Sequence, residues 1–75
     1  MSELMEMSAQ YRETGIACRG RMKEKRRRLQ SGKCGFYEEL ELKRSITMLT
    51  AMSRDCMEIA KYLKDYCERR DRREQ

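Results

Sequence analysis

Four cysteines are the residues of this chain most able to do chemistry. Cys18, Cys34, Cys56 and Cys67 are separated by 16, 22 and 11 residues, and the chain has neither a C-x-x-C pair nor a histidine. A structural zinc site needs four converging ligands, which usually come from such closely spaced pairs. Disulfide bonds need an oxidising compartment, which nothing in the sequence indicates. We therefore predict no metal and no cofactor. We expect Cys18, Cys56 and Cys67 to be small core residues, and Cys34 to be an exposed thiol.

Carboxylates are the other candidates for chemistry, as general acids or bases. Asp55 and Glu58 are three residues apart, so a helix would place them side by side, and Asp65 follows. The simpler interpretation is a solvated helix face with i,i+4 ion pairs, Arg54 with Glu58 and Lys61 with Asp65. The chain lacks a G-x-S-x-G motif, a P-loop and a Gly-rich phosphate loop. We predict that the protein is not an enzyme and has no catalytic residues.

Positive charge is concentrated in residues 19–33, which carry eight cations against Glu24 alone, a net of +7. We call these cations the basic collar, since on a helix they surround all but one side: Arg19, Arg21, Lys23, Lys25, Arg26, Arg27, Arg28 and Lys33. One hypothesis is phosphate binding, to DNA, RNA or a membrane surface. The other is an ordinary helix end, where the dipole favours cations.

The collar has no interleaved aromatic residues of the kind that stack on single-stranded bases. A long hairpin also leaves no short recognition helix. We therefore keep nucleic-acid contact as the second hypothesis and do not favour it. The residues that would make this contact are Arg19, Arg21, Lys23, Arg26, Arg27 and Arg28.

The elements that carry these residues are predicted to be helices only. The chain has 75 residues, no proline and 41% charged residues, and good helix formers dominate it. An apolar stripe with steps of four and three predicts a first helix over residues 2–30. The stripe comprises Leu4, Ser8, Tyr11, Gly15, Cys18, Met22, Lys25 and Leu29, and Met5, Ala9 and Ile16 would widen it.

A second helix is predicted over residues 36–72. Its stripe has the same steps and comprises Leu42, Ile46, Leu49, Ser53, Cys56, Ala60, Leu63 and Cys67. Beside it lies a second set of apolar residues, which we call the apolar row: Met48, Met52, Ile59, Tyr62 and Tyr66. The basic residues after Glu68 suit a helix C-terminus, and we expect this tail to fray.

A turn at Ser31–Gly35 would join the helices into one antiparallel hairpin domain over residues 1–75, with Gly32 ending the first helix in the left-handed conformation. The numbers of facing residues should then sum to about 67, which brings Cys18 to Leu49 and keeps all cysteines apart. Gly15 and Gly20 either kink the first helix or let its partner approach closely, and we favour close approach.

The first helix can cover only one stripe of the second, so the apolar row would stay exposed. Two hairpins that pack these rows together form a four-helix bundle. We therefore predict a non-catalytic interaction or assembly protein that is a homo-oligomer, with a dimer favoured and the apolar row as its interface. The alternatives are a different protein partner on this row, an accessory regulator that contacts nucleic acid through residues 19–33, or an export-chaperone-like hairpin. The usual acidic bias of such chaperones is missing here.

Two stretches carry a resemblance to a group of known proteins. They run from Tyr11-Arg12-Glu13 to Arg26-Arg27-Arg28-Leu29 and from Glu41-Leu42-Lys43 to Lys64-Asp65-Tyr66. The chain resembles small helical-hairpin proteins of unassigned function from Firmicute prophages and mobile elements. The resemblance implies a bacterial or phage origin and an accessory role, and it implies no functional residue.

No apolar run approaches the roughly 18 to 20 residues that span a bilayer. The N-terminus is acidic where a signal peptide is basic and then apolar. We predict a cytoplasmic protein that does not act at membranes.

Overall fold

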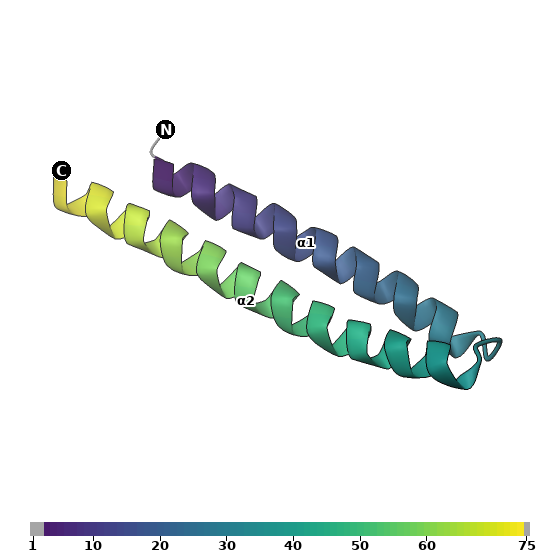
Figure 1. Cartoon of the computed structure of the whole chain (residues 1–75). Coiled ribbons are helices and arrows are strands. Elements are labelled where there is room, and N and C mark those ends of the chain that lie inside the picture. The colour runs from purple at the N-terminus through teal and green to yellow at the C-terminus, as the bar shows by residue number, and fades with distance from the viewer. Residues whose placement is uncertain (1–2, 75) are drawn as a thin grey trace.

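Residues 3–74 form two antiparallel α-helices joined by one turn (Figure 1). The computed structural model describes residues 3–74, with α1 at Glu3–Gln30 and α2 at Phe36–Glu74. The predicted all-helical hairpin is confirmed. The predicted start at residue 2 lies outside the described residues, and α2 continues two residues beyond the predicted end at residue 72. The fraying of the C-terminal tail stays a prediction.

The predicted stripe of α1 is the surface that contacts α2. Every stripe residue is buried or half-buried, and the only other residue of α1 that is not exposed is Met5. Ala9 and Ile16 do not widen the contact as predicted, because both are exposed, Ile16 at 57%. Two helices that touch along one line cover only a narrow stripe, and these two positions lie outside it.

The stripe of α2 is buried in the same way along its whole length, from Leu42 to Cys67. The core between the helices is thin. Its buried cluster consists of Cys18, Met22 and Leu49, with Ile46 packed against it. No large side chain among the described residues is completely buried. The hairpin therefore stabilises itself through little more than one line of contacts.

Two buried serines fix the register of the helices. The Ser8 hydroxyl donates to the Ala60 carbonyl at 2.7 Å, and the Ser53 hydroxyl donates to the Gly15 carbonyl at 2.8 Å. Both pairs of residue numbers sum to 68, so the predicted pairing near 67 is confirmed. Each buried hydrogen bond of this kind contributes about 1 kcal/mol.

Gly15 lies where the two backbones approach each other closely. A Cβ there would stand 3.0 Å from Met57 Sδ and 3.2 Å from the Ser53 carbonyl oxygen. Close approach is thus confirmed at Gly15. It is wrong for Gly20, which has nothing within 4 Å of such a Cβ, because Gly20 faces away from α2. Helix α1 runs unbroken through both glycines.

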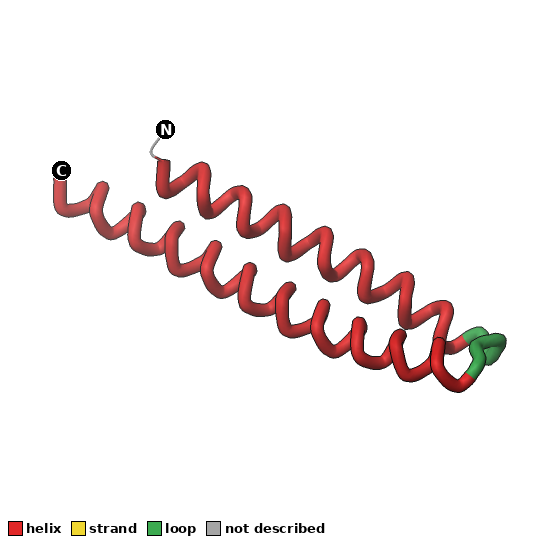
Figure 2. Tube along the Cα trace, viewed as in Figure 1, coloured by secondary structure: helices red, strands yellow, loops and turns green. Residues whose placement is uncertain are grey.

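The turn ends one helix and begins the next within five residues (Figure 2). Gly32 has a φ of +73°, the left-handed conformation predicted for it. The Ser31 amide and hydroxyl donate to carbonyls in the last turn of α1, those of Arg27 and Arg28, at 3.1 and 2.6 Å. The Gly35 carbonyl accepts the first hydrogen bond of α2, from the Glu39 amide at 2.9 Å.

The hairpin is a rod of 59 × 15 × 15 Å. Figure 1 shows both termini at one end, where α2 extends past the start of α1. Within residues 3–74, neither helix is both long and apolar enough to cross a membrane.

Candidate interaction surfaces

The apolar row of α2 is the main apolar surface that α1 leaves uncovered. Its five side chains are between 40% and 64% exposed: Met48, Met52, Ile59, Tyr62 and Tyr66. At 100° per residue, the row lies about 110° around α2 from the stripe that contacts α1. A single helix covers a narrower arc, so α1 cannot reach it. The row could therefore bury its apolar area only against another molecule.

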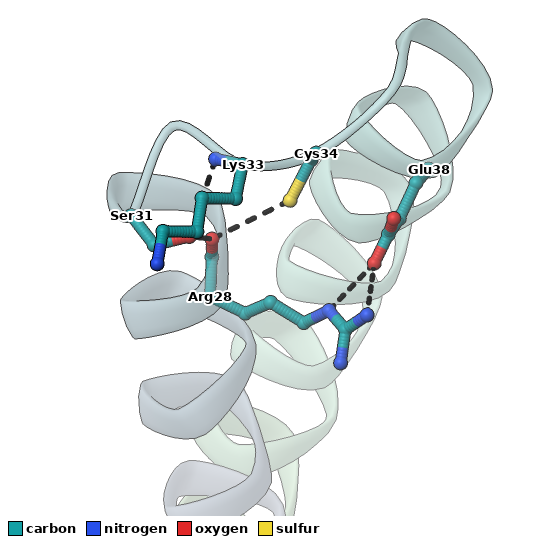
Figure 3. Close-up of polar contacts among 5 residues, drawn as sticks. All are labelled: Arg28, Ser31, Lys33, Cys34 and Glu38. Carbon is teal, nitrogen blue, oxygen red and sulfur yellow. Dashed lines mark hydrogen bonds and ion pairs between the residues drawn. The ribbon is translucent and has the colours of Figure 1, made fainter.

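An ion pair beside the turn shows which side of the hairpin carries the row (Figure 3). Arg28 donates to one carboxylate oxygen of Glu38 through Nε at 2.6 Å and through a terminal nitrogen at 2.5 Å. Met7 precedes Arg28 by three heptads, and Ile59 follows Glu38 by three heptads. Because the contact stripes keep heptad spacing along both helices, Met7 and Ile59 lie across from each other on this same side.

Met7 therefore belongs to the surface of the apolar row, and it is 42% exposed. The predicted apolar row did not include Met7, because that row was derived from the spacing of apolar residues in the second helix alone. The signal was present in the heptad spacing of the first helix. Its neighbours on this side of α1 are Gln10, Thr14 and Ala17, so α1 adds a small apolar area at the open end of the rod and little beyond it.

The basic collar surrounds the turn end of the rod. Its cations are exposed apart from the half-buried Lys25. Arg28 is engaged by Glu38, and Glu39 pairs with Lys43 at 2.9 Å on the first turns of α2. With Glu41 nearby, α2 thus presents three carboxylates at this end of the rod. The cations that form no ion pair within the described residues include Arg19, Arg21, Lys23, Arg26 and Arg27.

Three of the four cysteines lie in the core as predicted, and the prediction for the fourth is wrong. Cys18 and Cys67 are buried and Cys56 is half-buried. Cys34 was predicted to be exposed, and this is wrong. It is half-buried because the turn folds its thiol back onto the end of α1, where Sγ donates to the Arg28 carbonyl at 3.4 Å (Figure 3). No disulfide bond joins the four cysteines, and residues 3–74 contain no group of three or more side chains placed to hold a metal ion.

The carboxylates considered for acid–base chemistry all lie exposed on α2. The nearest cation to Asp55 is Arg54, at 3.9 Å. The predicted i,i+4 pairs of Arg54 with Glu58 and of Lys61 with Asp65 are wrong. Exposed ion pairs contribute only a few tenths of a kcal/mol, which is too little to fix such long side chains in one geometry.

On the opposite side of the hairpin from the apolar row lies a shallow groove of about 370 Å³. Both apolar side chains and cations line this groove, among them Met5, Ala9 and Met57 and the cations Arg12, Lys61 and Lys64. The periodicity of a single helix does not predict this groove, because its lining residues come from two helices.

Comparisons with models of protein families, with curated proteins and with solved structures find no match to this chain.

Proposed function

We propose that the protein is a non-catalytic assembly protein that acts by self-association through the apolar row. The observation that carries the proposal is the row itself, five large apolar or aromatic side chains that stay 40–64% exposed along one side of α2. Exposed apolar surface of this kind, which only Asp55 interrupts here, usually marks an interface. Methionine and tyrosine, which form most of the row, are also enriched at protein interfaces.

The accessible area supports a second copy as the occupant of this surface. The hairpin exposes 6511 Å². A monomeric globular protein of 9.1 kDa exposes about 4,900 Å². The excess of about 1,600 Å² falls within the range of roughly 1,000 to 2,500 Å² that each subunit of an obligate dimer buries. A globular dimer of twice this mass exposes about 8,100 Å², so two hairpins would reach that area by burying about 2,450 Å² each, which is near the upper end of this range.

The test is sedimentation equilibrium of the wild-type protein and of charged variants in the row. We expect a dimer, and we expect Ile59→Lys or Met52→Lys to weaken it at least about 100-fold, because an unpaired buried charge costs about 3 kcal/mol or more. Thr47→Lys is the matched control, since Thr47 is exposed on a polar side of the same helix. A wild-type protein that is helical and monomeric at micromolar concentration refutes the proposal.

A second candidate function is contact with nucleic acid through the basic collar. The observation that favours it is a cluster of exposed cations that form no ion pair within residues 3–74: Arg19, Arg21, Lys23, Arg26 and Arg27. Such a patch attracts phosphates without regard to sequence. A shift of labelled DNA or RNA that weakens steeply with salt is the measurement that decides this.

A further inference from the structure

We propose that the dimer is antiparallel, with its two-fold axis beside Ile59. The inference rests on the proposed function, since it concerns how two apolar rows face each other. It adds the relative orientation of the two subunits, the residues that face each other across the interface, and the residue that favours this arrangement.

The row continues at both ends with heptad spacing. Steps of three and four lead along one side of α2 through Ser45, Met48, Met52, Asp55, Ile59, Tyr62, Tyr66 and Arg69. This is the spacing with which a helix presents a second stripe to a partner helix. The apolar members and Arg69 are centred on Ile59, so two rows superimpose completely only when Ile59 faces Ile59 of the partner subunit.

Asp55 distinguishes this arrangement from the parallel one. In a parallel dimer, Asp55 would face Asp55 of the partner subunit inside the interface, where two like charges are costly. In the antiparallel register centred on Ile59, Asp55 faces Tyr62 of the partner subunit. The tyrosine hydroxyl can then donate a hydrogen bond to the carboxylate, which is one of the stronger kinds.

The charges of the rod favour the same orientation independently. Residues 19–48, at the turn end, carry a net charge of +6, and the rest of the chain carries −1. Parallel packing would place the two +6 ends side by side, at the 8–10 Å that separates packed helices. Antiparallel packing places them about 50 Å apart, several times the Debye length of about 8 Å at physiological salt.

Single cysteines in the row test the orientation, because a disulfide needs Cα atoms within about 7 Å of each other. We expect oxidised Ile59→Cys to form a dimer linked through residue 59, identified by peptide mass against the wild-type protein. Met48→Cys and Tyr66→Cys should not link to themselves. A mixture of Met52→Cys and Tyr66→Cys should link residue 52 to residue 66. Asp65→Cys, exposed on another side of α2, is the control for random collision.

The outcomes separate this inference from the function on which it rests. Self-linking of Met48→Cys and Tyr66→Cys in a protein that sediments as a dimer shows a parallel dimer and overturns the inference alone. A dimer without the Ile59→Cys link overturns the register. A wild-type monomer overturns both. Circular dichroism of each variant checks that the hairpin is intact, as expected because the substituted positions are exposed.

Discussion

Single atoms decide how closely the two helices pack. Gly15 is buried at the contact between α1 and α2, while Gly20 is exposed on the same helix, so the two glycines are a matched pair. The two buried serines, Ser8 and Ser53, act at the same scale. Each hydroxyl reaches across to a carbonyl of the other helix, and thereby sets which residues face each other.

Gly15→Ala should destabilise the hairpin by about 1 kcal/mol. Overpacking of a contact costs about 1–3 kcal/mol, and the better helix propensity of alanine returns about 1 kcal/mol. Met57 can swing away from the new methyl group, but the Ser53 carbonyl oxygen belongs to the backbone of α2 and cannot. The measurement is the urea midpoint of the variant against the wild type.

Gly20→Ala is the control in the same helix, and it should stabilise by about 1 kcal/mol because its Cβ meets nothing. Equal effects of the two substitutions would show that the backbones do not approach closely at Gly15.

At the scale of the elements, the sequence predicted the helices well because their periodicity is strong. The stripes of both helices follow from steps of three and four along the chain, and the turn and the pairing near 67 follow from the Ser31–Gly35 cluster between them. What the sequence could not give was the detail that depends on both helices together. Cys34 was misplaced because its environment is the end of α1. Met7 was missed because its neighbour Ile59 lies on the other helix.

The two glycines of the turn test how residue type determines local backbone conformation. Gly32→Ala should destabilise by about 1 kcal/mol, because Gly32 has a φ of +73° and an alanine there is strained. Gly35→Ser is the matched change in the same turn. Gly35 has an ordinary φ and precedes the first residue of α2, where serine caps a helix slightly better than glycine.

Thermal unfolding followed by circular dichroism should therefore show a lower midpoint for Gly32→Ala and an unchanged or slightly higher one for Gly35→Ser. A Gly32→Ala midpoint equal to that of the wild type would contradict the assigned turn conformation.

At the scale of the whole molecule, the rod separates an apolar surface on one side from a cationic end. The apolar row can be tested without touching the collar, and the collar without touching the row. Arg28 is a poor choice for a collar variant, because its side chain is held by Glu38 and its loss also loosens the turn.

Arg26→Glu with Arg27→Glu is the cleaner test of nucleic-acid contact. If the collar binds phosphates, this double variant should abolish a low-salt band shift of DNA or RNA. The logarithm of the wild-type binding constant should also fall linearly with the logarithm of the salt concentration, with a slope set by the number of phosphates contacted. Lys61→Glu with Lys64→Glu makes the same change in net charge elsewhere on the rod. Equal losses from both double variants would indicate attraction by net charge and no defined site.

The position of the two chain ends has a mechanical consequence. The start of α1 and the end of α2 lie at the same end of the rod (Figure 1), so a force applied between these two helix ends loads the contacts between the helices one after another. The hairpin should then unzip from its open end at low force, and Ser8 with Ala60 should part before Cys18 with Leu49. Compression along the long axis is resisted by two continuous helices. The hairpin should therefore be stiff under compression along its axis and weak under a force that pulls its two helix ends apart.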